Sequence, residues 1–210
     1  MKKRLLATAL TTLVVGASVT ALPAAPASAA PGKRSLATVL AADGHHFDRK
    51  WGDFDILDKA VMTVLAAKPD SAVGVLADGS VKLTAFLPTD RAFRRLVHDL
   101  TGKRPGTEKA TFNRLAKATG VDTIEAVLLY HVVPGARITY AQAKASDGAK
   151  LKTALGPVVT VNVRKHGRIA LQDRDFNDAN ATIMRSGRNI NSRNLQIGHA
   201  ITRVLRPANL

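Results

Sequence analysis

The spacing of apolar residues changes partway along the chain, and this change decides the fold class. Up to about residue 133, apolar residues recur every three or four positions, as in helices with one buried face. This spacing predicts helices over 53–67, 89–101, 107–120 and 122–131. Gly102 and Gly120 stand where two of these helices should end, because glycine readily adopts the left-handed conformation that terminates helices.

Beyond residue 150 the period falls to two. Valines at 159, 161 and 163 alternate with polar residues, and a turn at 165–168 leads into a second alternating run at 169–171. This pattern predicts a hairpin of half-buried strands. A last strand is expected over 196–205, after a shorter one at 182–184. Helices first and strands later indicate an α+β domain and not an alternating α/β sheet.

The first 29 residues carry the pattern of a secretory signal peptide. Lys2, Lys3 and Arg4 precede an apolar run over 5–19, and Ala27-Ser28-Ala29 offers a small-residue cleavage site. The alternative is a membrane anchor, which needs about 20 consecutive apolar residues. Prolines at 23 and 26 end the run before that length. We therefore expect cleavage after Ala29, secretion, and a short linker over 30–35.

The chain contains no cysteine. This excludes a disulfide framework and a lipid-anchored cysteine at the cleavage site. We find no second apolar segment long enough to span a membrane. The expected product is a secreted protein of a bacterial source, released or held non-covalently at the cell wall, with one domain over 36–207.

The chain is strongly basic. Its formal net charge is +15, and loss of Lys2, Lys3 and Arg4 with the leader lowers it to +12. Such a balance favours anionic partners. For a secreted protein we expect an anionic glycan or wall polymer and no nucleic acid. The alternative is that the charge only keeps the protein in solution.

Three segments carry a resemblance to a known family. Residues 84–93, Thr-Ala-Phe-Leu-Pro-Thr-Asp-Arg-Ala-Phe, place a strand before Pro-Thr-Asp and a helix. Residues 128–135 read Leu-Leu-Tyr-His-Val-Val-Pro-Gly, and residues 199–207 read His-Ala-Ile-Thr-Arg-Val-Leu-Arg-Pro. In this order the three segments closely resemble the signatures of fasciclin domains. Thr202 and Gln196 depart from the family pattern, which usually has Asp and Gly there, so interactions of that Asp are not carried over.

The resemblance implies a fasciclin-like wedge, a β-sandwich with helices packed on one side. It also implies a secreted adhesion module that binds a cell-surface or matrix protein, with no enzymatic activity. The alternative function is binding of anionic polysaccharide or cell-wall polymer. Salt should separate the two, because binding through many charges weakens with ionic strength.

Two groups of residues are candidates for partner binding. Tyr130 and His131 lie in the family's central segment, which is linked to receptor contact in animal members. His131 shares an apolar helix face with Ile124 and Val127, so we expect a buried, hydrogen-bonded imidazole instead. His199 is expected to be buried in the same way.

The second group consists of basic residues in the C-terminal part of the chain, most of them arginines, whose forked donors suit carboxylate, sulfate and phosphate. The candidates for an anionic-polymer patch are Arg164, Lys165, Arg168, Arg174, Arg185, Arg188, Arg193, Arg203 and Arg206. The alternative is that these charges are scattered over the surface.

The sequence predicts no metal site, no cofactor and no catalytic residue. Residues 173–178 begin like a calcium loop, but Asp178 replaces the required glycine and Met184 replaces the bidentate glutamate. His45 and His46 lack an obvious third ligand. The common nucleophile and metalloprotease motifs are absent from the sequence.

Overall fold

The computed structural model describes residues 30–208, so the predicted signal peptide over 1–29 lies outside the described residues. The helices are α1 (Leu36–Leu40), α2 (Asp55–Ala67), α3 (Asp90–Thr101), α4 (Glu108–Tyr130) and α5 (Tyr140–Lys144). Short 3-10 turns occupy Ala41–Asp43, Ala72–Leu76, Lys165–Gly167 and Arg185–Gly187. Within residues 30–208, no helix combines the length and apolar character needed to cross a bilayer.

Glycines end or break two of these helices where the sequence predicts it. Gly102 follows α3 with φ 67°, in the left-handed region. Gly120 interrupts α4 with φ 73° and ψ 170°, so α4 consists of two helical segments joined at a kink. The predicted break near residue 120 is therefore confirmed.

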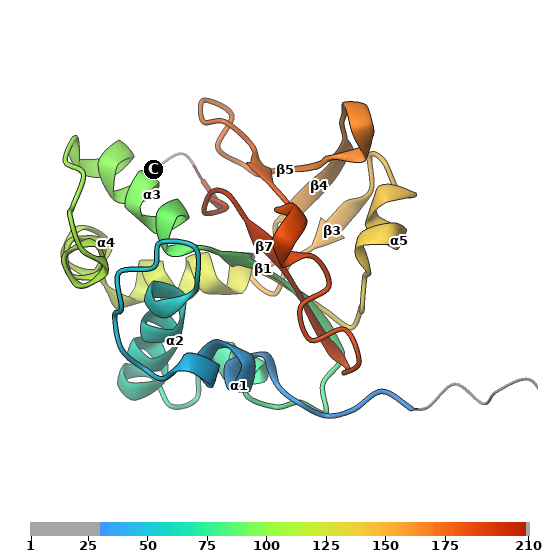
Figure 1. Cartoon of the computed structure of the whole chain (residues 1–210), viewed down its shortest axis with the longest axis horizontal. Coiled ribbons are helices and arrows are strands. Elements are labelled where there is room, and N and C mark those ends of the chain that lie inside the picture. Colours follow the sequence, from blue (N-terminus) through green and yellow to red (C-terminus); the bar gives the residue numbers. More distant parts are fainter. Residues whose placement is uncertain (1–29, 209–210) are drawn as a thin grey trace, which may run out of the picture. The chain divides into compact units, whose positions relative to one another are not determined.

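The strands form two sheets (Figure 1). The first has the order β2-β1-β7, in which β1 (Leu83–Pro88) pairs antiparallel with β2 (Val132–Pro134) and parallel with β7 (Gln196–Ile201). The second is antiparallel throughout, in the order β3-β4-β5-β6. Its strands are β3 (Lys150–Lys152), β4 (Val158–Val163), β5 (Ile169–Gln172) and β6 (Ala181–Thr182).

Strand β1 separates two apolar cores, and this explains why all six of its residues are buried. Leu83, Ala85 and Leu87 belong to a core shared with helices α2, α3 and α4. Phe86, on the opposite face, belongs to a core between the two sheets. Helices α2, α3 and α4 therefore cover one face of the three-stranded sheet and the second sheet covers the other, which confirms the α+β class (Figure 1).

The two departures from the family pattern both take part in structural hydrogen bonds. Gln196 is fully buried; its Oε1 accepts from the Leu36 N–H at 2.7 Å, and its Nε2 donates to the carbonyls of Val75 and Asp78. Thr202 Oγ1 accepts from the Thr182 N–H at 3.0 Å. Strand β7 ends at Ile201, four residues before the expected end at 205.

Candidate functional site

The four-stranded sheet has one face that points away from the core. Along β4, Val159 and Val161 are buried between the sheets, whereas Thr160 and Asn162 alternate with them and remain partly exposed. Register extends this face to the neighbouring strands, because directly opposed residues lie on the same side of a sheet. The residues of this outer face are Lys150, Lys152, Val158, Thr160, Asn162, Ala170, Gln172 and Thr182, and the hydrogen-bonded Arg164 and Arg168 continue it into the β4–β5 turn.

Five cations gather on the outer face and at its adjoining turn, and all are exposed: Lys150, Lys152, Arg164, Lys165 and Arg168. Lys150 and Lys152 lie opposite Thr160 and Val158 on the edge strand β3. The other three surround the β4–β5 turn. They line an open groove of about 480 Å³, whose remaining lining residues are Ala170, Asn180 and Thr182. The groove thus combines fixed positive charge with amide and hydroxyl groups.

Helix α5 braces the turn that carries these cations. The Tyr140 hydroxyl donates to the Gly167 carbonyl at 2.6 Å, and the Arg164 N–H donates to the Arg168 carbonyl at 2.7 Å. A side chain at Gly167, which has φ 68°, would meet the side chain of Lys144. The turn is therefore held by α5 and by its own backbone hydrogen bond.

No acidic residue is among the outward-facing residues of this sheet within residues 30–208. The carboxylate of Asp147 lies beside the β3 edge, where it accepts a hydrogen bond from the Val163 N–H at 2.6 Å. None of the five cations forms an ion pair with a described carboxylate. The field over the outer face is accordingly positive and available to a ligand.

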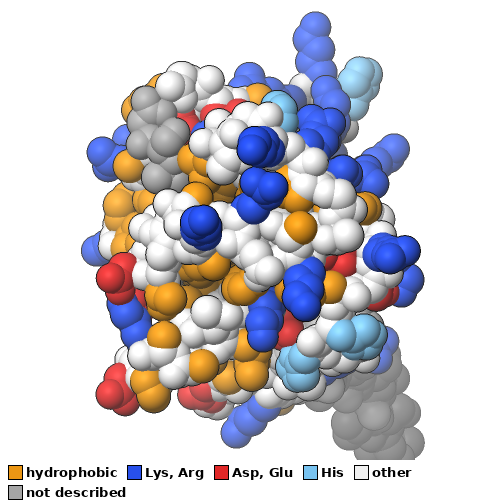
Figure 2. Space-filling model, turned by 90° about the vertical axis from the view of Figure 1, so that its left-hand side faces the viewer, with side chains coloured by type: hydrophobic (Ala, Val, Ile, Leu, Met, Phe, Trp, Pro, Cys, Tyr) orange, Lys and Arg blue, Asp and Glu red, His pale blue; other side chains and the backbone are white. Residues whose placement is uncertain are grey.

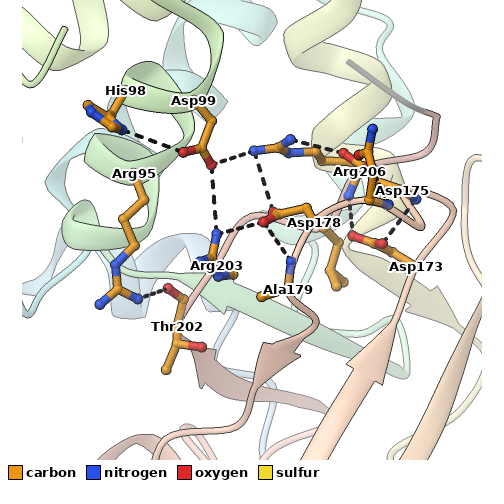
Figure 3. Close-up of polar contacts among 12 residues, drawn as sticks. Arg95, His98, Asp99, Asp173, Asp175, Asp178, Ala179, Thr202, Arg203 and Arg206 are labelled. Carbon is orange, nitrogen blue, oxygen red and sulfur yellow. Dashed lines mark hydrogen bonds and ion pairs between the residues drawn. The ribbon is translucent and has the colours of Figure 1, made fainter. Parts of the chain in front are cut away.

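Two of the nine predicted patch residues are engaged elsewhere. Arg206, which is buried, pairs with Asp175 at 2.9 Å and with Asp99 at 2.8 Å, and Arg203 pairs with Asp178 at 2.8 Å (Figure 3). We call these five residues the arginine cluster. It ties the loop after β5 to helix α3 and leaves neither guanidinium for a partner.

The other predicted arginines do not join the outer face as one patch. The guanidinium of Arg188 stacks 3.7 Å from the ring centre of Tyr140 and donates to its hydroxyl. Arg174 is exposed on the loop between β5 and β6, and Arg185 and Arg193 are exposed in the connection between β6 and β7. The nine residues are thus divided among several places, and three of them, Arg164, Lys165 and Arg168, share the groove.

Tyr130 and His131 lie inside the domain, with 0% and 4% of their surface exposed. The His131 Nδ1–H donates to the Val127 carbonyl at 2.7 Å, and Nε2 accepts from the Leu205 N–H at 2.9 Å. Burial lowers the pKa of His131 to about 4, so the ring is neutral. The Tyr130 hydroxyl donates to the Val158 carbonyl, and burial raises its pKa to about 12.

His199 is buried in the same manner. Its Nε2–H donates to the Ile138 carbonyl at 2.9 Å, Nδ1 accepts from the Asn189 N–H, and burial lowers its pKa. The expectation of buried, hydrogen-bonded imidazoles is confirmed. A binding role for Tyr130 and His131 stays a prediction, and neither side chain reaches the surface in this conformation.

The helical side of the domain offers a contrast to the outer face. Figure 2 shows it, with Lys and Arg side chains distributed among uncharged and apolar ones.

Lys150 and Lys152 were not among the sequence candidates. The signal that could have identified them is the alternation Lys-Leu-Lys directly before the predicted hairpin, which is typical of an edge strand with one solvent-exposed face.

This chain matches a known protein family. A family model for the fasciclin domain matches residues 59–207. A comparison with curated proteins finds no match. Among solved structures, a FAS1 domain pair from the insect cell adhesion molecule fasciclin I aligns over 72% of this chain at 15% identity, with a TM-score of 0.49. The chain spans 47% of the length of that domain pair. Since the family model covers most of the chain, this protein belongs to the fasciclin domain family.

Proposed function

We propose that this protein is an extracellular adhesion module that binds an anionic polysaccharide or wall polymer through the outer face of its four-stranded sheet. Fasciclin domains are in general non-enzymatic adhesion modules and are typically extracellular, which supports the class of function. The charge of the outer face supports the class of ligand.

The observation that carries the proposal is the group of five unpaired cations on and beside one sheet face. Arginine guanidinium groups bind carboxylate, sulfate and phosphate through two parallel hydrogen bonds. The hydroxyls of Thr160 and Thr182 and the amide of Asn162 can serve the sugar hydroxyls between the charged groups. A polymer lying across the strands would meet cations at both ends, from Lys150 and Lys152 to Arg168.

We also propose that the protein reaches this ligand by export and cleavage of its signal peptide. We expect signal peptidase to cut after Ala29, and the released domain to associate non-covalently with the wall. N-terminal sequencing of the exported protein checks the cleavage site.

Binding to isolated cell walls across a salt series tests the ligand. We expect saturable binding that weakens steeply with added salt, because exposed charges are screened over about 8 Å at physiological ionic strength. Replacing Lys150, Lys152 and Arg168 with glutamine should weaken binding by at least tenfold. The matched control replaces Lys103, Arg104 and Lys117, which are exposed on the helical side, and loses the same charge. Equal loss in both variants would mean that net charge alone drives binding and would overturn the assignment to the outer face.

A protein partner is the second candidate, and one observation favours it. Phe176 is 82% exposed on the loop after β5, while its neighbour Asp175 is buried against Arg206. An aromatic side chain on a braced loop is the kind of anchor that protein interfaces use. Binding that survives high salt and is lost on Phe176→Ala would favour this partner over the polymer.

A further inference from the structure

Three carboxylates converge on the helical side of the domain, far from the outer face. Asp53 lies in the loop before α2, Asp90 is the first residue of α3, and Glu108 is the first residue of α4. One oxygen from each lies within 4.8 Å of the corresponding oxygens of the other two. We call these three residues the carboxylate cluster.

The backbone fixes the orientation of these side chains. Asp90 Oδ1 accepts from the Ile56 N–H at 2.9 Å, and Glu108 Oε2 accepts from the Arg49 N–H at 2.9 Å. The Asp90 N–H donates to the Asp53 carbonyl at 3.1 Å. Each of the two buried acids therefore has one oxygen occupied by a backbone donor, and this leaves its second oxygen for the interior of the cluster.

Those second oxygens accept no hydrogen bond. Asp90 Oδ2, Glu108 Oε1 and Asp53 Oδ1 are buried without a partner within residues 30–208, and Asp90 and Glu108 are only 0% and 1% exposed. No arginine within residues 30–208 forms an ion pair with the cluster. A buried carboxylate oxygen without a donor is costly, so something outside the chain must satisfy these atoms.

The surrounding chemistry fits a hard cation. The ligand atoms are all oxygens, as Ca²⁺ and Mg²⁺ prefer, with no imidazole or thiolate among them. A second carboxylate triad, Asp48, Asp53 and Asp55, shares Asp53 with the first, and in it Asp48 is paired with Lys50. Five of the chain's 16 acidic residues thus gather at one place in a basic protein.

Coordination flexibility favours calcium. Ca²⁺ accepts six to eight oxygen ligands at about 2.3–2.6 Å in irregular geometry. Mg²⁺ requires a near-ideal octahedron and usually keeps several of its waters, so it is seldom bound by a cage made of protein groups alone. Three carboxylates whose oxygens lie within 4.8 Å of one another suit the more adaptable ion.

We propose that Asp53, Asp90 and Glu108 form a binding site for one Ca²⁺ ion. Bound there, the ion would tie the loop before α2 to the first turns of α3 and α4. Glu108 also lines an open groove of about 540 Å³ beside this loop, which gives the ion a route from solvent.

The competing occupant is a proton. Burial, together with the neighbouring Asp53 carboxylate, raises the pKa of Asp90 to about 9, so without an ion Asp90 is protonated at neutral pH. A cluster that only holds a proton should not respond to added Ca²⁺, whereas a calcium site should, and a Ca²⁺ titration measures this difference.

The test is a titration of the chelator-treated full-length protein with Ca²⁺ alone, followed by calorimetry and by thermal unfolding. We expect one ion per chain and a rise in Tm of about 3–10 °C at about 10 mM Ca²⁺, as for an extracellular site of submillimolar to millimolar affinity. Asp53→Asn should abolish both. Asp122→Asn is the matched control, because Asp122 is an exposed aspartate that pairs with Lys68 elsewhere.

Trp51 supplies a local signal for the same site. It is the only tryptophan in the chain and lies two residues from Asp53, so it should sensitise the luminescence of Tb³⁺ bound in place of Ca²⁺. Added Ca²⁺ should displace this signal, and Glu108→Gln should lose it if Asp53→Asn fails to fold. An unchanged Tm and no heat at about 10 mM Ca²⁺ would overturn the proposal. A full calcium response in Asp53→Asn would overturn it equally.

Discussion

Two groups of buried or half-buried carboxylates within residues 30–208 differ in their partners, because arginines of the chain neutralise one group and not the other. In the arginine cluster, Asp99, Asp175 and Asp178 are paired with Arg203 and Arg206 (Figure 3). In the carboxylate cluster, three acids face one another and no arginine within residues 30–208 is paired with them.

The difference teaches how to separate a structural brace from a binding site. An acid group with its own guanidinium partners is complete, and its contacts hold one element to another. An acid group with unsatisfied oxygens is incomplete and depends on a proton or an ion from solvent. The same reasoning applies to the cations. The guanidinium of Arg206 is paired with carboxylates of the chain, whereas Arg168 lines the groove and forms no ion pair with a described carboxylate.

The largest effect is expected from removing the central cation of the arginine cluster. Arg206→Ala leaves Asp175, which is fully buried, with an uncompensated charge, and we expect a loss of about 3–5 kcal/mol in the free energy of unfolding. Urea denaturation measures this. Arg185→Ala, at an exposed arginine, should change stability by no more than about 0.5 kcal/mol. Similar losses in both variants would mean that the arginine cluster is not a special brace.

The second effect is a loss of stability at acidic pH that arises from His131. His131 has a folded-state pKa of about 4, below its unfolded value of about 6.5, so the unfolded chain binds the extra proton in this interval. The contribution of His131 to the free energy of unfolding should be fully present above pH 6.5. It should be lost, by about 3 kcal/mol, as the pH drops through 4. Urea midpoints measured across this range check the slope, and His131→Gln should flatten it. If the slope persists in that variant, other groups account for the loss.

The smallest effect is the change in the free energy of unfolding when one aspartate of each cluster is replaced with asparagine, and its sign should differ between the two clusters. Without calcium, Asp53→Asn should raise the free energy of unfolding by about 1 kcal/mol, because it removes the carboxylate that faces the buried Glu108 across the cluster. Asp175→Asn should lower it by about 2 kcal/mol, because Arg206 loses a charged acceptor. Thermal unfolding of both variants in chelator gives the comparison. Destabilisation of the same size in both would remove the distinction drawn between the clusters.

Much of the fold follows from local sequence. The three fasciclin signatures, the break at Gly120 and the hairpin after residue 158 are each written in contiguous residues. The burial of His131 was also predictable, because it shares a helix face with Ile124 and Val127.

The sites were less predictable, since they depend on packing between distant segments. Arg203 and Arg206 belong to the same basic stretch as Arg168, yet they turn toward Asp99 on α3, which is about a hundred residues away in the chain. Lys150 and Lys152 join the outer face only through the pairing of β3 with β4. The expectation of no metal site rested on contiguous motifs, and the carboxylate cluster draws its members from positions 53, 90 and 108.

The parallel pairing of β1 with β7 has a consequence for how the chain acquires its structure. The strand between the two cores lies early in the sequence, and its partner over six residues is the last strand of the domain. Neither core can close before that strand arrives, because β1 would keep an open edge. Pairings between strands so distant in sequence also form slowly. Folding of this domain therefore waits for its final segment.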